Sequence, residues 1–161
     1  MALAPAPRLP RLPRLPIDSS LLFKLVRVVN LTARPFVETL SRIHHLSLSE
    51  WRTMVVLASH PGVAAREVAE FTGLDKMSVS RAITALARHR RVRKRPDARD
   101  ARRTQLWLSA SGHALFESIG ALAGEREAYL FKGIARADQA ALSKTIDRLI
   151  LALQSSKTEE A

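Results

Sequence analysis

Residues 64–90 decide the fold, and they read AAREVAEFTGLDKMSVSRAITALARHR. The first part, 64–71, has the spacing of a short helix, which the Thr-Gly pair at 72–73 ends with a turn. Asp75 then caps a second helix over about 76–90. Two helices joined by a tight glycine turn predict a helix-turn-helix, a unit that presents its second helix to a partner.

The second helix of this unit has two unlike faces. Val79, Ile83, Leu86 and Ala87 recur at helical spacing and predict a buried side. The opposite side is small, polar and basic, so it suits the major groove of DNA, which is about as wide as a helix. We expect this outer face to consist of Lys76, Met77, Ser78, Ser80, Arg81, Thr84 and Arg88.

Most of the net charge lies in and just after this unit. The 161 residues carry 26 Lys and Arg against 15 Asp and Glu, a net charge of +11. The window 76–103 holds 11 basic residues and only 2 acidic ones, which leaves a net +2 for the rest of the chain. Charge concentrated in one stretch indicates a polyanionic partner, although a solvated Arg-rich loop is the plainer alternative.

A basic β-hairpin follows the helix-turn-helix. Residues 92–95 and 104–108 read as short strands, and the Pro-Asp-Ala-Arg-Asp turn at 96–100 joins them. Arg99, near the tip, is placed to enter a minor groove, where narrow A·T tracts concentrate negative potential. With this wing, the predicted DNA contacts are Lys76, Met77, Ser78, Ser80, Arg81, Thr84, Arg88, Arg95, Arg99 and Arg103.

A long helix precedes the winged unit, which spans about 48–108. Apolar residues recur at helical spacing over 19–45, and Asp18 can cap that helix, with the two following serines as competitors. Pro35 lies inside it and predicts a kink or a break. Ser49 is expected to begin the next helix, whose apolar face comprises Trp51, Met54, Val55 and Ala58.

Two more helices are predicted after the hairpin. Ser109 or Ser111 starts one that runs to about Gly133, and Asp138 caps the last. In the last helix the apolar residues are spaced by 4, 3 and 4, the pattern of a helix-packing seam. That seam comprises Leu142, Ile146, Leu149 and Leu153.

The two ends of the chain differ in composition from the middle. Residues 1–16 contain Arg-Leu-Pro three times in succession, which favours polyproline II and opposes a helix. We interpret them as a disordered leader, or alternatively as a basic arm that packs on a partner subunit or touches phosphate. Residues 155–161 are expected to be a short tail, which leaves 17–154 as one domain.

Other classes of function find no support in the residues. The chain has no Cys, which excludes disulfides, thiolate metal sites and Cys nucleophiles. Its His residues form no metal-ligand grouping, and no catalytic set is recognisable, so we expect no metal, no cofactor and no enzyme activity. We see neither a secretory signal nor an apolar run of about 18 residues, so we expect a cytoplasmic protein without a membrane partner.

Several segments together carry a resemblance to a known family. They are LSLSEWR at 46–52, AREVA at 65–69, DKMSVSRAI at 75–83, RPDARDAR at 95–102, LWLS at 106–109 and Gly112. On these residues the chain resembles the MarR family of bacterial transcriptional regulators, over roughly 18–153. The Asp-x-Arg-Asp-x-Arg pattern of the wing is the specific segment among them.

The resemblance implies a winged helix-turn-helix homodimer on a pseudo-palindromic operator. Asp75 to Arg90 maps to the recognition helix and Arg99 to the wing tip, while Asp100 and Arg102 map to residues that brace the wing. The helices over 18–45 and 110–154 map to the dimerisation helices. The chain departs from the family at the proline in its first helix, and the absence of Cys excludes the peroxide-sensing branch.

The resemblance also implies a small anionic or aromatic effector, bound between the dimerisation helices and the DNA-binding lobe. We expect an aromatic carboxylate such as a phenolic acid, or its thioester. The candidate effector-binding residues are Arg27, Arg34, His44, Trp51 and Arg52. The plainer interpretation makes Trp51 a core residue and His44 a surface group.

The sequence therefore predicts a double-stranded DNA-binding transcriptional regulator with sequence specificity. We expect a homodimeric repressor that a small aromatic or phenolic ligand releases from DNA. The alternative is a non-specific architectural or RNA-binding winged-helix protein. The two differ in the ratio of their affinities for an operator and for random duplex at one salt concentration.

Overall fold

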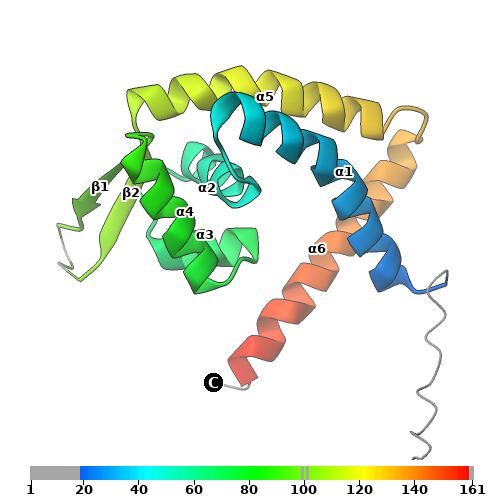
Figure 1. The fold of residues 1–161 in the computed structure, drawn as a ribbon. Helices are drawn as coiled ribbons and strands as arrows, with labels where there is room; N and C mark the ends of the chain where they lie inside the picture. Colours follow the sequence, from blue (N-terminus) through cyan, green and yellow to red (C-terminus); the bar gives the residue numbers. More distant parts are fainter. Residues whose placement is uncertain (1–18, 99, 101, 160–161) are drawn as a thin grey trace, which may run out of the picture.

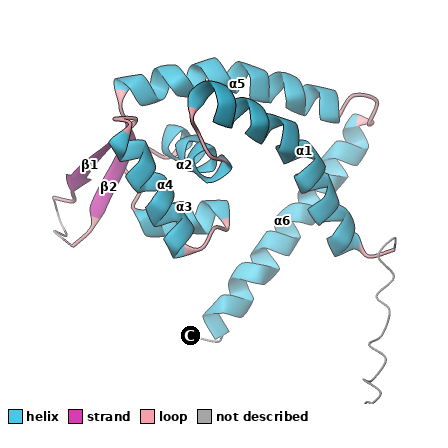
Figure 2. Cartoon of the chain, viewed as in Figure 1, coloured by secondary structure: helices cyan, strands magenta, loops and turns pink. Residues whose placement is uncertain are grey.

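The computed structural model describes residues 19–98, 100 and 102–159. Figures 1 and 2 show a largely helical chain with one two-stranded sheet, which confirms the predicted mainly α fold with a small hairpin wing. The elements are α1 (Leu21–His44), α2 (Leu48–Ser59), α3 (Ala65–Thr72), α4 (Lys76–Arg88), β1 (Val92–Pro96), β2 (Thr104–Leu108), α5 (Ala110–Leu130) and α6 (Arg136–Glu159). The predicted arm over 1–16, the cap at Asp18 and the wing-tip Arg99 lie outside the described residues.

The core lies among α2, α3, α4 and the hairpin. Helix α2 contacts α3, α4, β2 and α5, so it occupies the centre of this lobe. Met54 of α2 is fully buried, as are Val68 of α3, Leu86 of α4 and Leu106 of β2. Because these side chains belong to one apolar cluster, the three helices and the hairpin form a single packed unit.

The hairpin is joined to the core along β2. The two strands are antiparallel, with Val92 opposite Leu108. On the other edge of β2, the Leu106 N–H donates to the Val63 carbonyl at 3.0 Å and the Gly62 N–H donates to the Leu106 carbonyl at 2.8 Å. Strand β2 is thus bonded on both sides, and β1 is left as the outer strand with residues 93–96 exposed.

Helix α2 begins earlier than predicted. Its N-cap is Ser47 and not Ser49, because Ser47 forms a reciprocal pair of hydrogen bonds with Glu50. The Ser47 hydroxyl accepts from the Glu50 N–H at 3.2 Å, and the Ser47 N–H donates to the Glu50 carboxylate at 3.1 Å. The N–H groups of Ser47 and Glu50 are both satisfied in this way. Ser49, the predicted first residue, has no Glu or Gln three residues later and could not form this pair.

The predicted apolar face of α2 is partly wrong. Trp51 and Met54 are buried as expected, but Val55 is exposed. The additional buried residues are Thr53, Val56 and Leu57. A single stripe was expected, whereas α2 packs against α4 on one side and α5 on another and therefore buries more of its circumference.

Helix α1 is not broken at Pro35. One helix runs from Leu21 to His44, and the Ser20 hydroxyl caps it by accepting from the Phe23 N–H at 3.3 Å. Figure 1 shows the axis of α1 changing direction along its length. A proline removes one backbone hydrogen bond, and the turns on either side are enough here to keep the helix continuous.

Helix α5 begins directly after the hairpin. Ser109 is its N-cap, and its hydroxyl accepts from the Gly112 N–H at 3.0 Å. The helix ends at Leu130, before Gly133, whose φ of +86° is left-handed and cannot continue a right-handed helix. Figure 1 shows α5 running from the hairpin across the molecule to the turn that leads into α6.

The last helix starts before the predicted cap. Helix α6 begins at Arg136, so Asp138 lies in its first turn, where a carboxylate still favours the positive end of the helix. The helix continues to Glu159, past the boundary at 154 where a tail was expected. Among the described residues, no helix combines the length and the apolar character needed to cross a bilayer.

Candidate nucleic-acid interface

The outer face of α4 is exposed along its whole length. Val79, Ala82, Ile83 and Leu86 point into the core. Ser78, Ala85 and Ala87, the last of which was expected to be buried, are half-buried, and the other positions are exposed. A shallow hollow of about 240 Å³ on this face is lined by Ser80, Arg81, Thr84, Ala85 and Arg88. The exposed residues that were predicted from sequence are Lys76, Met77, Ser80, Arg81, Thr84 and Arg88.

Ser78 differs from the other predicted contacts because it takes part in the cap of α4. The Ser78 N–H donates to one oxygen of Asp75 at 2.8 Å, and the Ser78 hydroxyl donates to the other at 2.6 Å. These bonds hold the pKa of Asp75 below its ordinary value of 3.8. The hydroxyl proton of Ser78 is therefore committed within the protein, and only its oxygen is left to accept a bond from DNA.

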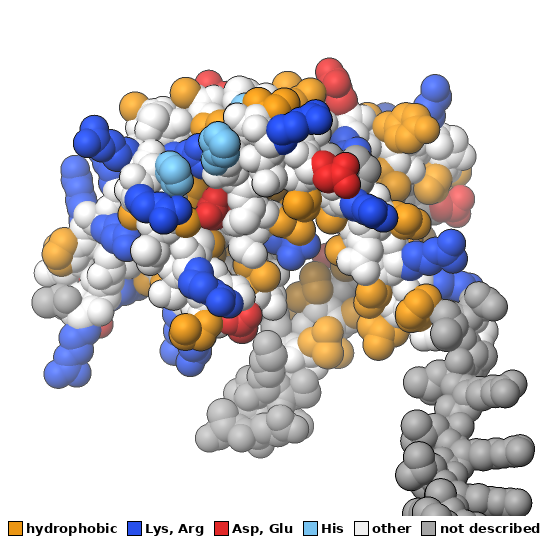
Figure 3. Space-filling view, viewed as in Figure 1, with side chains coloured by type: hydrophobic (Ala, Val, Ile, Leu, Met, Phe, Trp, Pro, Cys, Tyr) orange, Lys and Arg blue, Asp and Glu red, His pale blue; other side chains and the backbone are white. Residues whose placement is uncertain are grey.

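The hairpin places a basic strand beside α4. Helix α4 contacts β1, and Figure 3 shows Lys and Arg side chains gathered over the end of the molecule that holds these two elements. Arg93, Lys94 and Arg95 are all exposed on β1. The Arg95 guanidinium lies 5.9 Å from the centre of the Trp107 ring across the hairpin, an arrangement that supports the side chain without neutralising it.

Arg103, a predicted DNA contact, is bonded within the protein. Its Nη2 donates to the Glu67 carboxylate at 2.6 Å, and its Nε lies 3.8 Å from the Asp97 carboxylate. Asp97 also accepts from the Gln105 side chain at 2.9 Å. Arg103 therefore ties the hairpin to α3, whereas the family resemblance implied that Asp100 and Arg102 brace the wing.

Asp100 and Arg102 were expected to brace the wing, and of these two residues Asp100 is the one that accepts hydrogen bonds within the turn. Its carboxylate accepts from the Arg102 N–H at 2.9 Å, and its carbonyl accepts from the Arg103 N–H at 2.9 Å, so it closes the turn locally. The side chain of Arg102 is exposed. Of these two neighbouring arginines, Arg103 is therefore the one whose side chain is bonded within the protein, and Arg102 is the one whose side chain is exposed.

Two further arginines in the basic window hold the fold together. Arg91 donates through its guanidinium to the carbonyl of His44 at 2.7 Å and of His45 at 3.4 Å, which fastens the end of α1. The carbonyl of Arg90 accepts from the hydroxyls of Ser109 and Ser111 at the start of α5. The guanidinium of Arg91 therefore has a structural role, whereas Arg90 takes part only through its backbone carbonyl.

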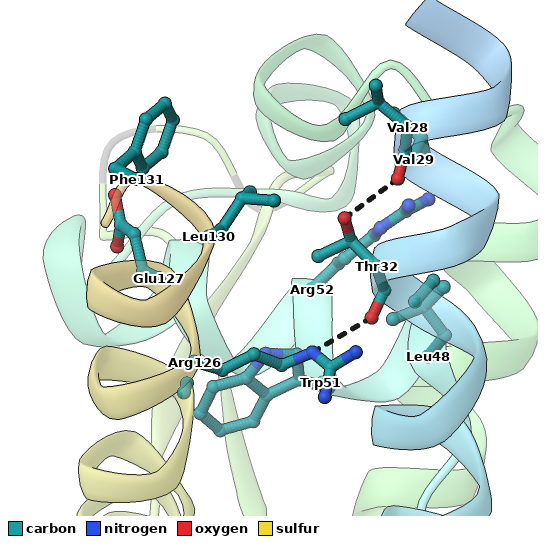
Figure 4. Close-up of a pocket in the computed structure, with 12 residues that line it drawn as sticks. Val28, Val29, Thr32, Leu48, Trp51, Arg52, Arg126, Glu127, Leu130 and Phe131 are labelled. Atoms are coloured by element: carbon teal, nitrogen blue, oxygen red, sulfur yellow. Dashed lines mark hydrogen bonds between the residues drawn. The ribbon is translucent and has the colours of Figure 1, made fainter. Parts of the chain in front are cut away.

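A cavity of about 440 Å³ lies between α1, the start of α2 and α5, beside the winged unit (Figure 4). Of the five residues predicted to bind an effector, Trp51 and Arg52 line it. Arg27, Arg34 and His44 do not, and Arg34 instead lies 3.7 Å from Glu38 on the exposed side of α1. The other lining residues are Val28, Val29, Thr32, Ala33, Leu48, Ala123, Arg126, Glu127, Leu130 and Phe131.

Sequence reasoning missed Arg126. Its Nε donates to the carbonyl of Thr32 at 3.0 Å, so it connects α5 to α1 across the pocket. The sequence shows only that Arg126 is a basic residue in the second half of a helix that is expected to pack against others. That signal is too weak to single out Arg126, because the sequence does not identify its partner. Among the described residues, no group of His, Asp and Glu is arranged to hold a metal ion.

Comparison with known proteins finds a matching family model and solved structures of the same fold. Residues 44–103 match the sequence model of the MarR family. No curated protein sequence matches the chain. A MarR/EmrR family transcriptional regulator from Acinetobacter sp. ADP1 has the same fold, with a TM-score of 0.80 and 22% identity over 88% of this chain and 99% of that one.

Two other solved structures share the fold. CouR from Rhodococcus jostii RHA1, bound to p-coumaroyl-CoA, has a TM-score of 0.75 and 20% identity over 83% of this chain and 94% of its own. BpsR from Bordetella bronchiseptica, whose DNA binding is regulated by 6-hydroxynicotinic acid, has a TM-score of 0.73 and 19% identity over 82% of this chain and 94% of its own. The resemblance to the MarR family and its winged-helix fold is confirmed.

Proposed function

Since the chain has the MarR fold and its residues 44–103 match that family, we propose that it is a sequence-specific, double-stranded DNA-binding transcriptional regulator. One observation carries the proposal: the exposed polar face of α4 and the basic outer strand β1 lie next to each other at one end of the molecule. Helix α4 then reads the major groove while the hairpin reaches the neighbouring minor groove.

The protein acts as a homodimer in this proposal. The seam of α6 is exposed in the single chain, with Leu142, Ile146 and Leu149 between 36% and 47% exposed. Helix α1 is likewise apolar and exposed, at Leu22, Leu25, Val26 and Val29 among others. A second copy that covers these faces removes apolar surface from water and presents two α4 helices to a pseudo-palindromic operator.

The protein is further proposed to be a repressor that a small aromatic ligand releases from its operator. The cavity between α1, α2 and α5 supports this, because its wall includes the start of α2 and α2 packs directly against α4. A ligand that favours one arrangement of these helices over another therefore changes the affinity for DNA.

The test compares Arg81→Ala with Arg136→Ala on a duplex selected from a random library by the full chain. Arg81 is exposed on α4, whereas Arg136 lies at the start of α6, so only the first substitution is expected to weaken binding, by about 1–3 kcal/mol. The wild-type log affinity should fall with log salt by about 0.9 for each phosphate neutralised.

Three outcomes would contradict the proposal. Equal affinity for the selected and the random duplex at one salt concentration would indicate a non-specific or architectural protein. A preference for RNA over duplex DNA would indicate the RNA-binding alternative. A salt dependence near zero would contradict the basic footprint itself.

A further inference from the structure

The helix that faces DNA in the proposed function lacks most of the side chains that distinguish bases by hydrogen bonds. Helix α4 contains no Asn, Gln, Asp or Glu. Asn and Gln are the side chains that bind adenine at two points in the major groove, and Asp and Glu accept from the amino group of cytosine. Guanine and thymine remain as the bases that α4 can read directly, because Arg binds guanine and apolar groups contact the methyl group of thymine.

Arg81 is the arginine placed to bind guanine. It is exposed in the first half of α4, and it forms no ion pair with another described residue. Its guanidinium therefore keeps two N–H donors for O6 and N7 of one guanine. Arg88 lies in the last turn of α4. Because a helix in this arrangement contacts base edges with its N-terminal residues, Arg88 lies nearer to the phosphates.

The hollow of about 240 Å³ on the outer face of α4 supplies an apolar contact beside Arg81. Arg81 and Arg88 line it, and the other lining residues, Ser80, Thr84 and Ala85, all have short side chains. The methyl groups of Thr84 and Ala85 are therefore reachable from a groove, whereas a longer side chain at either position would fill the space. A methyl group on a base edge that packs against them leaves water without losing a hydrogen bond.

The spacing of these residues along the helix assigns the two contacts to different base pairs. Arg81 and Thr84 are separated by three positions in α4, which corresponds to about 4.5 Å along a helix axis. Successive base pairs of duplex DNA are about 3.4 Å apart. A base bound by Arg81 and a methyl group packed on Thr84 therefore belong to neighbouring base pairs.

We propose that α4 recognises a guanine through the Arg81 guanidinium and the C5-methyl group of a thymine in a neighbouring base pair through the hollow at Thr84 and Ala85. Adenine and cytosine in each half of the operator are then selected only as the pairing partners of these bases. This inference rests on the proposed function of sequence-specific DNA binding, and it names the bases that the helix reads.

Met77 is the other apolar group on this face of the helix. It lies in the first turn of α4 and is 67% exposed. Because Met77 precedes Arg81 and Thr84 follows it, a thymine in contact with Met77 would lie on the other side of the bound guanine. A methyl contact by Met77 and one by Thr84 are therefore distinguished by the position of the thymine and by the substitution that removes the contact.

The experiment measures the affinity of the full chain for the duplex that it selects from a random library, with single bases altered in one half of that duplex. Deoxyuridine lacks only the methyl group of thymine, and 7-deazaguanine lacks the N7 acceptor of guanine. We expect deoxyuridine at one thymine to lower affinity about threefold to fivefold, and 7-deazaguanine in a neighbouring base pair to lower it about tenfold. As a control, 7-deazaadenine at each adenine should leave the affinity unchanged, because α4 has no amide side chain to bind N7 and the amino group.

Two substitutions of Thr84 form a matched pair. Thr84→Ser removes the methyl group and keeps the hydroxyl, so the variant should bind the thymine and deoxyuridine duplexes equally well. Thr84→Val keeps a methyl group and removes the hydroxyl, so it should retain the preference for thymine. Arg81→Ala should bind the guanine and 7-deazaguanine duplexes equally well. Melting curves verify that each variant is folded.

Four results would overturn the inference. They are deoxyuridine without effect at every thymine, a methyl effect that Thr84→Ser leaves at its wild-type size, sensitivity to 7-deazaguanine that persists in a folded Arg81→Ala, and a loss of affinity with 7-deazaadenine. A chain that binds selected and random duplex equally contradicts the proposed function as well. A chain that prefers the selected duplex and gives one of the four results contradicts this inference alone.

Discussion

The winged lobe (α2, α3, α4 and the hairpin) and the two helices α1 and α6 use apolar residues in opposite ways. Apart from Leu40 and Ile119, every buried apolar residue of the described chain lies between Leu46 and Leu108. The core therefore lies mostly in the winged lobe, and Leu40 of α1 and Ile119 of α5 complete it. Helices α1 and α6 instead leave large apolar side chains in solvent, and Figure 3 shows them on the part of the molecule away from the basic end.

This difference indicates which part of the chain buries its apolar residues as a monomer and which part needs a second surface to cover them. A packed core stabilises a fold without help, whereas an exposed apolar stripe is stabilised only when another surface covers it. The predicted seam of α6 is such a stripe, and its exposed residues are Leu142, Ile146, Leu149 and Leu153. We therefore expect changes in the winged lobe to alter folding, and changes in α6 to alter assembly.

The largest effect is expected from Leu149→Glu. Leu149 belongs to the α6 seam, and each copy of a dimer would bury one new carboxylate, which should weaken dimerisation by about 4 kcal/mol or more. Analytical ultracentrifugation should then show monomers. A thermal melting curve should show that the winged lobe still unfolds cooperatively. Leu151→Glu lies on the other side of α6 and serves as the control, and a Leu149→Glu protein that stays dimeric would show that the interface is elsewhere.

The next largest effect is expected from Gly112→Ala, at the point where α5 leaves the winged lobe. A Cβ on Gly112 would lie 2.1 Å from the carbonyl oxygen of Arg91, so backbone must shift, at a cost of about 3 kcal/mol. Gly124→Ala is the matched substitution in the outer half of the same helix, where a Cβ meets nothing within 4 Å. It should raise stability by about 0.5–1 kcal/mol.

Urea unfolding of both glycine variants measures this contrast. The free energy of unfolding should fall for Gly112→Ala, because the new Cβ collides with the backbone of the winged lobe. It should rise for Gly124→Ala, because that alanine only improves the helix. Equal destabilisation by both would mean that α5 is a structural part of the winged lobe along its whole length.

A smaller effect separates Arg103 from Arg102. Arg103 is half-exposed and paired with Glu67, so Arg103→Ala should lower the free energy of unfolding by about 1 kcal/mol. DNA affinity should fall while its salt dependence stays the same, because no phosphate contact is lost. Arg102→Ala should leave unfolding unchanged and reduce the salt slope by about 0.9 if its exposed side chain contacts a phosphate. If Arg103→Ala reduced the salt slope and Arg102→Ala lowered stability, Arg103 would be the DNA contact and Arg102 the bracing residue, as the sequence predicts.

The smallest effect concerns the cap of α4. The pKa of Asp75 is lowered by its bonds to Ser78, so the ionised carboxylate stabilises the folded state above its ordinary value of 3.8. This stabilisation is lost as the pH falls through the lowered folded-state pKa. The difference in Tm between wild type and Asp75→Asn should therefore be positive near neutral pH and shrink on acidification. A difference that is constant with pH would assign the cap to hydrogen-bond geometry alone.

The sequence alone determined most of the local structure. Gly73 takes the left-handed φ of +68° that the predicted turn requires, and Asp75 caps α4 as expected. The two strands and the buried positions Val79, Ile83 and Leu86 also follow from patterns within a few residues. Where these predictions were wrong, as for the cap of α2 and the start of α6, a neighbouring residue satisfied the same physical need better.

Only the tertiary structure decided what each arginine does. The charge of an arginine is visible in the sequence, but its role depends on a partner brought close by folding. Arg103 meets Glu67 across 36 residues, Arg91 meets His44 across 47 and Arg126 meets Thr32 across 94. No local sequence pattern encodes such contacts. An arginine can therefore be interpreted from the sequence as a DNA contact, as a residue that stabilises the fold or as a ligand-binding group, and only its surroundings in the folded chain distinguish these roles.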